Sequence, residues 1–122
     1  MENIILNQQQ LQYAEVYISD MPSLKNIFLQ SQNPSRLNQD FGVPFLLVKK
    51  KNEVLGFASL IMNGKAEISF KIYAKNGITD SEKKNFNLHA ESYFKKNTTA
   101  NFRNPEQLKS SIDRMVNWLN VG

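Results

Sequence analysis

The chain has 122 residues, of which 41% are hydrophobic and 21% charged, a composition typical of one globular domain with a single core rather than of a disordered chain. It contains no cysteine, which excludes disulfide bonds, thiol chemistry and cysteine-bound metals. The formal net charge of +4 comes mostly from lysine, since the arginines are only Arg36, Arg103 and Arg114. Because arginine is the better ligand for phosphates and bases, this excess is a weak indication of nucleic-acid binding.

The N-terminal third is predicted to hold a short strand and two helices. Residues 3–6 are apolar and form a candidate first strand. Residues 8–19 lack Gly and Pro and carry apolar residues at helical spacing, namely Leu11, Ala14 and Ile18. A second helix is expected to begin at Asp20-Met21-Pro22, where a capping residue precedes a proline in the first turn. Residues 31–44 show no periodicity and are expected to form a long loop.

The middle of the chain predicts an antiparallel meander of three strands over residues 45–50, 54–62 and 66–73. The first pair of strands is expected to join near Lys51-Asn52. Asn63-Gly64 is expected to form a type I′ turn between the second pair. That turn would place Phe57 opposite Phe70, on one apolar face with Leu55, Ile61, Ile68 and Ile72.

The last third is predicted to be helical. Thr79-Asp80-Ser81-Glu82 has the pattern of a capping box at the start of a helix. A second helix is expected to begin at Pro105, with apolar residues Leu108, Ile112, Met115 and Leu119 on one side. Residues 98–102, between these helices, are a candidate additional strand. We therefore expect one α+β domain over residues 1–122, with the meander packed against about four helices.

The segment FLLVKKKNEVLGFASLIMNGKAEISFKIY, residues 45–73, resembles the second to fourth strands of the GNAT N-acetyltransferase family, including the small Gly56 and Ala58 of its third strand. The order of predicted elements is similar to the front two-thirds of that fold. The resemblance implies acetyl-CoA as cofactor, bound at Ile72 and Tyr73 and at the turn Gly77-Ile78-Thr79. It also implies Glu67 as the base for an acceptor amine, whereas a surface ion pair between Glu67 and Lys71 is the simpler account of this carboxylate.

Four departures from the family pattern favour a domain without efficient catalysis. Of the family's Q/R-x-x-G-x-G/A phosphate-binding turn, residues 74–79 keep only Gly77. Asp80 and Glu82 lie in the first helical turn, where they would repel a pyrophosphate. Residues 104–119 hold no tyrosine to serve as general acid, and the chain stops before the family's last strands. The resemblance therefore implies at most a weak acyl-CoA-dependent N-acetyltransferase.

The alternative is a non-catalytic interaction module that binds a protein partner or a second copy of itself and needs no cofactor. A third interpretation is non-specific nucleic-acid binding through the lysine clusters at residues 49–51, 83–84 and 95–96. No nucleic-acid motif accompanies those clusters, so a solvated surface is the expected role.

No other group of residues in the sequence predicts a catalytic or metal-binding site. His89 is the single histidine and has no carboxylate at helical spacing, so neither a metal site nor a charge-relay pair is expected. Tyr13, Tyr17 and Trp118 could line a groove, but at helical spacing such residues are more often core or core-edge residues. No basic region precedes an apolar segment at the N-terminus, and residues 54–62 are far shorter than the roughly 20 residues of a membrane span. A cytoplasmic protein that does not enter a membrane is therefore expected.

Overall fold

The structure is a computed structural model, which describes residues 11–32 and 36–121. It has an α+β fold with one antiparallel sheet in the strand order β1-β2-β3-β4 and three main helices. The strands are β1 (Gln12–Glu15), β2 (Val43–Lys50), β3 (Glu53–Met62) and β4 (Ile68–Ala74). The main helices are α2 (Met21–Gln32), α3 (Asp80–Lys96) and α5 (Pro105–Val121). The short helical segments are η1 (Ile18–Asp20), η2 (Gln39–Phe41) and α4 (Ala100–Arg103).

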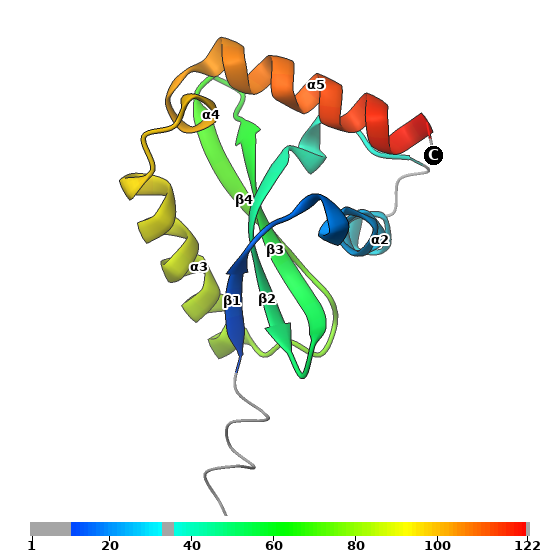
Figure 1. Ribbon diagram of the computed structural model, residues 1–122. Helices are drawn as coiled ribbons and strands as arrows, with labels where there is room; N and C mark the ends of the chain where they lie inside the picture. The colour runs from blue at the N-terminus through cyan, green and yellow to red at the C-terminus, as the bar shows by residue number, and fades with distance from the viewer. Residues whose placement is uncertain (1–10, 33–35, 122) are drawn as a thin grey trace, which may run out of the picture.

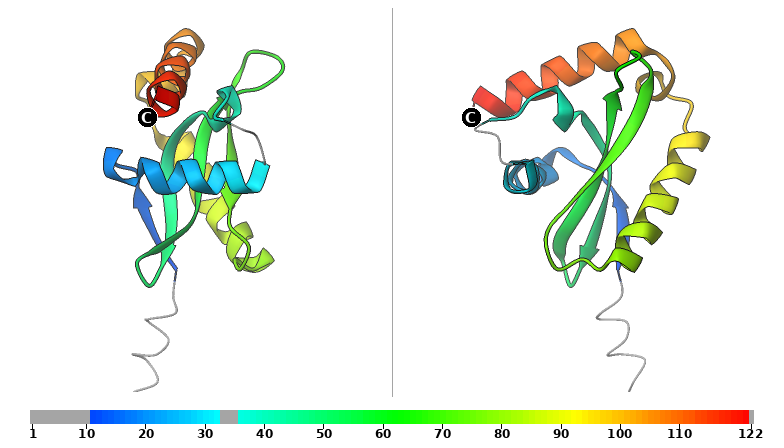
Figure 2. Two further views of the ribbon diagram at one scale, coloured as in Figure 1. Left: turned by 90° about the vertical axis from the view of Figure 1, so that its right-hand side faces the viewer. Right: turned by 180° about the vertical axis from the view of Figure 1, so that it is seen from behind.

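The helices cover three sides of the sheet (Figure 1). α2 crosses one face and α3 runs along the opposite face, while α5 lies across the end of the sheet that carries the β3–β4 connection (Figure 2). Under α2 the core is aromatic, with the rings of Phe28 and Tyr73 5.1 Å apart and those of Phe57 and Tyr73 5.3 Å apart. Under α3 a second aromatic group forms, in which Phe45 stacks on Tyr93 at 5.7 Å and Phe70 contacts Phe94 at 5.4 Å.

The predicted helix over residues 8–19 is wrong in its described part, because Gln12–Glu15 form β1. This strand pairs with β2, and Tyr13 lies opposite Val48. The sheet therefore has four strands rather than three. Aromatic and β-branched residues are common around β1, and they favour a strand once a partner edge is present. The candidate strand at residues 3–6 lies outside the described residues.

The three meander strands were predicted correctly to within two residues at each end, but the β3–β4 register was not. Phe57 lies opposite Tyr73, and Phe70 lies opposite Leu60. This register differs from the expected one by an odd number of positions, so it places Phe57 and Phe70 on opposite faces of the sheet. Phe57 packs under α2 with Phe41, whereas Phe70 packs under α3 with Phe94.

The loops between the strands explain why the β3–β4 register differs from the expected one. The β3–β4 loop runs from Asn63 to Glu67, and its residue with positive φ is Ala66, at 59°. The type I′ turn expected at Asn63-Gly64 is instead the geometry of the β2–β3 hairpin, where Lys51 has φ 52° and Asn52 has φ 66°.

Both long helices of the C-terminal third begin where the local sequence predicts. Thr79 caps α3, and α5 begins at Pro105, as expected. The candidate strand at residues 98–102 is wrong, because Ala100–Arg103 form the single helical turn α4. Phe102 of α4 is buried against Phe45 and Tyr93, so this segment closes the α3 side of the core rather than extending the sheet.

Candidate functional site

Tyr73, one of the residues expected to meet a cofactor, is buried under α2. Its hydroxyl donates a hydrogen bond to the backbone carbonyl of Asp40. Burial, with the nearby Asp40 carboxylate as a smaller cause, raises the pKa of Tyr73 far above its ordinary value. This phenol is therefore a neutral structural group that ties β4 to the segment before β2. Its neighbour Ile72 points to the other face of the sheet, opposite Ala58.

The turn before α3 is occupied by its own side chains. Gly77 has φ 104°, and Thr79 is the N-cap of the helix. The Thr79 hydroxyl accepts from the Glu82 amide at 3.1 Å, and the Glu82 carboxylate accepts from the Thr79 amide at 2.9 Å. The hydrogen bond from the Thr79 backbone is the main reason that the pKa of Glu82 lies below its ordinary value. Two amide groups of the helix N-terminus are thus satisfied within the chain.

Glu67, the expected base, is exposed in the β3–β4 loop. Its amide donates to the side-chain oxygen of Asn63 at 3.0 Å, and its carboxylate lies 3.4 Å from the side-chain nitrogen of the same residue. Among the ion pairs of the described residues, none joins Glu67 to Lys71. β4 separates Glu67 from Gly77, Ile78 and Thr79, so the structure does not bring these candidate residues together.

A groove lies between the outer edge of β4 and the first turns of α3. We call it the lysine groove, and it is lined by Phe70, Lys71, Ile72, Asp80, Lys83, Lys84 and Asn87. Its volume is about 470 Å³. Of the expected cofactor-binding residues, only Ile72 lines it. The lysines supply positive charge, while Asp80 places a carboxylate at the same site.

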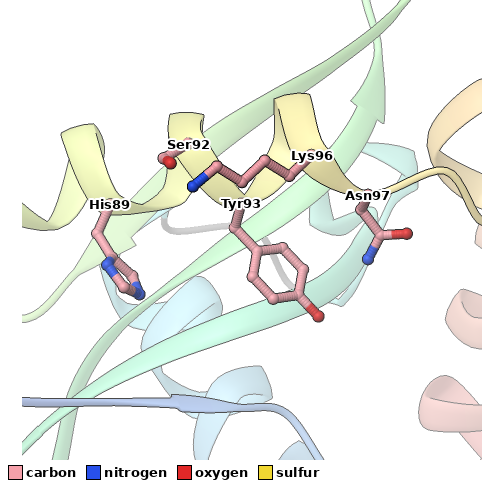
Figure 3. A pocket seen from close by; sticks show the side chains of 5 residues that line it. All are labelled: His89, Ser92, Tyr93, Lys96 and Asn97. Atoms are coloured by element: carbon pink, nitrogen blue, oxygen red, sulfur yellow. The ribbon is translucent and has the colours of Figure 1, made fainter.

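A second hollow lies between α3 and the edge strand β1 (Figure 3). We call it the β1–α3 groove, and it is lined by His89, Ser92, Tyr93, Lys96 and Asn97. The Tyr93 hydroxyl donates to the carboxylate of Glu15 at 3.1 Å. Burial is the main reason that the pKa of Tyr93 is raised, and this hydrogen bond adds to the effect. The His89 ring lies 4.5 Å from the ring of Tyr13. These two contacts set the position of α3 against β1.

A third hollow, of about 430 Å³, lies where η1, β2 and α5 meet. We call it the Trp118 surface, and it is lined by Ile18, Val43, Asn101, Ser111, Arg114, Met115 and Trp118. Ile18 is 74% exposed and Trp118 is 52% exposed. The side of α5 that packs on the sheet instead carries Leu108, Ile112 and Val116. Trp118 is therefore not needed to fill the core.

No family model, curated protein or solved structure matches this chain. Within residues 11–32 and 36–121, His, Asp and Glu side chains form no group of three that could hold a metal ion. No helix in the same part of the chain is both long enough and apolar enough to cross a bilayer. The function therefore has to be inferred from the surfaces of the molecule.

The sequence identified some of these residues but not their arrangement. His89 is exposed on α3. The expectation that Tyr17 and Trp118 belong to the core or its edge is wrong, since Tyr17 is 68% exposed and Trp118 about half exposed. Periodicity correctly predicts that Leu108 and Ile112 are buried, but the third buried residue of α5 is Val116, whereas Met115 and Leu119 are only partly buried. Periodicity gives no reason, however, why the indole of Trp118 should share a hollow with Ile18, which lies a hundred positions earlier in the chain.

Proposed function

We propose that this domain is a non-catalytic protein-binding module of the cytoplasm, and that its partner docks on the Trp118 surface. The observation that carries the proposal is the exposure of Trp118 and Ile18 in one hollow. An indole that is half exposed adds little to the folding free energy of the domain. In a protein interface, by contrast, a buried tryptophan contributes more binding energy than most other residues.

The composition of the Trp118 surface supports this function. Trp, Met and Arg are the residue types enriched at protein interfaces, and here Trp118, Met115 and Arg114 lie in consecutive turns of one helix. Arg114 is exposed and has no ion-pair partner among the described residues. An acidic side chain on the partner would pair with it at the margin of the apolar contact.

The proposal can be tested with a photo-crosslinking amino acid placed at position 114, beside Trp118 on the same surface, in the full chain in living cells. Asn76 provides a control, because it is exposed in the turn between β4 and α3 and lines neither the Trp118 surface nor the hollow between α3 and β1. We expect an adduct of defined mass from position 114 and none from position 76, and Trp118→Ala should remove the adduct. Equal labelling at both positions, or no adduct at either, would contradict the proposal. Sedimentation equilibrium of the purified chain shows whether the partner is a second copy.

A second candidate function is a GNAT-like domain with weak acyl-CoA-dependent N-acetyltransferase activity. It is favoured by the lysine groove, where Ile72 lies beside Lys71, Lys83 and Lys84. These ammonium groups could hold the phosphates of acetyl-CoA. The capping box of Thr79 and Glu82 weighs against this function, because it satisfies amides that a pyrophosphate would otherwise bind. We therefore rank it below protein binding.

Thermal melting with acetyl-CoA tests the second candidate. A ligand that binds only the folded state, at about a hundred times its Kd, adds roughly 2.7 kcal/mol to the free energy of unfolding. In a domain of this size, that gain raises Tm by several degrees. The double variant Lys83→Glu/Lys84→Glu should lose the shift. An unchanged Tm of the unmodified protein would exclude this candidate and leave protein binding as the function.

A further inference from the structure

β1 is an edge strand whose outer side faces no other strand in the described part of the chain. The amide of Val16, directly after β1, donates to the carbonyl of Phe45 at 3.4 Å, so it points toward β2. Backbone groups alternate in direction along an antiparallel pair. The amides and carbonyls of Tyr13 and Glu15 therefore point outward. The amide of Tyr17 donates to the Asp20 carboxylate, so the row of free backbone groups ends before Tyr17.

The two edges of the sheet differ in how well they are protected against pairing with a strand of another chain. β4 carries the exposed Lys71 at its centre, and a charged lysine on an edge strand discourages pairing with another chain. β1 has the sequence QYAE, without lysine or proline. Its outer side adjoins the β1–α3 groove, whose volume is about 340 Å³. Open backbone groups beside a hollow for side chains are the two elements of peptide recognition by strand addition.

We propose that β1 and the β1–α3 groove form a second binding site, distinct from the Trp118 surface, which takes an extended acidic segment of another protein as a fifth strand of the sheet. Side chains of the added strand that lie opposite Tyr13 and Glu15 share the face of the sheet covered by α3. They would meet His89 and Tyr93, whose rings both point from the helix toward β1 (Figure 3).

The charges of the domain beside the free edge indicate that the added segment is acidic. Lys95 is paired with Glu91 at 2.9 Å, but Lys96 lines the groove and has no ion-pair partner among the described residues. One unpaired ammonium group thus lies beside the free edge, on the face covered by α3. Glu15, the carboxylate at this edge, already accepts a hydrogen bond from Tyr93. An incoming carboxylate would be attracted to Lys96, whereas an incoming lysine would be repelled by it.

The test uses a phage-displayed library of random peptides, selected on the full chain. The enriched peptide is then synthesised and titrated by calorimetry and by amide NMR. We expect enrichment of peptides that carry an acidic residue in an extended, alternating pattern. Binding should shift the amide signals of Tyr13 and Glu15. The absence of enrichment, or shifts confined to other strands, would overturn the proposal.

Three variants separate this site from any other. Glu15→Pro removes an outward amide while leaving the bonds to β2, a change that edge strands tolerate. Ser92→Trp fills the groove from an exposed position and does not disturb the core. Lys96→Glu reverses the charge. Each should weaken the selected peptide by about tenfold, the loss of roughly one hydrogen bond or charge contact. An affinity unchanged in Ser92→Trp and Lys96→Glu would overturn the proposal, even if Glu15→Pro failed to fold.

A matched control distinguishes this site from the proposed function. Trp118→Ala, on α5 and not among the residues that line the β1–α3 groove, should leave the affinity for the selected peptide unchanged while it removes the adduct at the Trp118 surface. A peptide that loses affinity in Trp118→Ala and not in Ser92→Trp binds the Trp118 surface, and that result would refute the strand-addition site.

Discussion

The amide of Ala66 donates to the carbonyl of Asn63 at 3.0 Å and closes the turn between β3 and β4. The side-chain oxygen of Asn63 accepts from the amides of Lys65 and Glu67 at 2.9 and 3.0 Å, so one asparagine organises the loop. In this arrangement the left-handed position is Ala66, at φ 59°, and Gly64 is not in the left-handed region. Alanine is strained there, since a Cβ atom disfavours this backbone conformation.

We predict that Ala66→Gly stabilises the protein by about 0.5–1 kcal/mol. The left-handed conformation costs alanine about 1–2 kcal/mol, and part of this gain is lost because glycine is more flexible in the unfolded chain. Urea denaturation followed by circular dichroism measures the change. A loss of stability would mean that Ala66 does not occupy the left-handed position.

Gly64→Ala is the matched test in the same loop. A Cβ atom at Gly64 would meet no heavy atom within 4 Å, so the variant should be neutral or up to about 1 kcal/mol more stable through the reduced entropy of its unfolded state. A type I′ turn at Asn63-Gly64 would give the opposite result, because that turn needs positive φ at both residues. The pair of variants therefore reports the β3–β4 register in solution.

The N-cap of α3 gives a second prediction. Thr79→Ala removes the hydroxyl that accepts from the Glu82 amide, and it should lower the free energy of unfolding by about 1 kcal/mol. Ser81→Ala is the control, since Ser81 is exposed in the same turn and makes no hydrogen bond of its own among those of the described residues. Equal losses in the two variants would show that the cap hydrogen bond is not responsible, because alanine has the higher helix propensity and does not by itself weaken the helix.

Glu82 should make stability depend on acid pH. The pKa of Glu82 is lowered in the folded protein, so its contribution is present above the pKa of the unfolded chain and is lost as pH falls through the folded value. Glu82→Gln keeps a side chain that can cap the helix but removes the titration. The difference in stability between the two proteins should therefore shrink as pH is lowered below about 4.3, the ordinary value for glutamate. A difference that is constant between pH 7 and pH 3 would contradict the capping geometry.

Alanine variants at two positions on α5 should distinguish a core residue from a surface residue. Leu108 is fully buried, and Leu108→Ala should cost about 2–5 kcal/mol through lost packing and the cavity left behind. Trp118→Ala should cost about 1 kcal/mol or less, because half of the side chain is already in solvent. A large loss in Trp118→Ala would assign the indole to the core and remove the main support for the proposed function. Thermal and urea denaturation of both variants provide the comparison.

The residues that the sequence predicted well are those whose partners are close in the chain. The capping box of α3 joins residues three positions apart, and the start of α5 depends on Pro105 itself, so both were visible without a fold. The β2–β3 hairpin was placed correctly for the same reason, because two alternating apolar segments meet across Lys51-Asn52. Local hydrogen bonds and dihedral preferences decide such features.

The remaining features depend on contacts between distant segments, and these only the tertiary structure decided. Residues 12–15 are a strand because β2 offers them an edge, which overrides their helical spacing. The β3–β4 register follows from burying Phe57 under α2 and Phe70 under α3 at once. Trp118 and Ile18 line one hollow, and Tyr93 reaches Glu15, only after α5 and α3 have packed. The sequence by itself therefore determined the helix starts and the first hairpin, whereas long-range burial determined the sheet edge and both proposed binding surfaces.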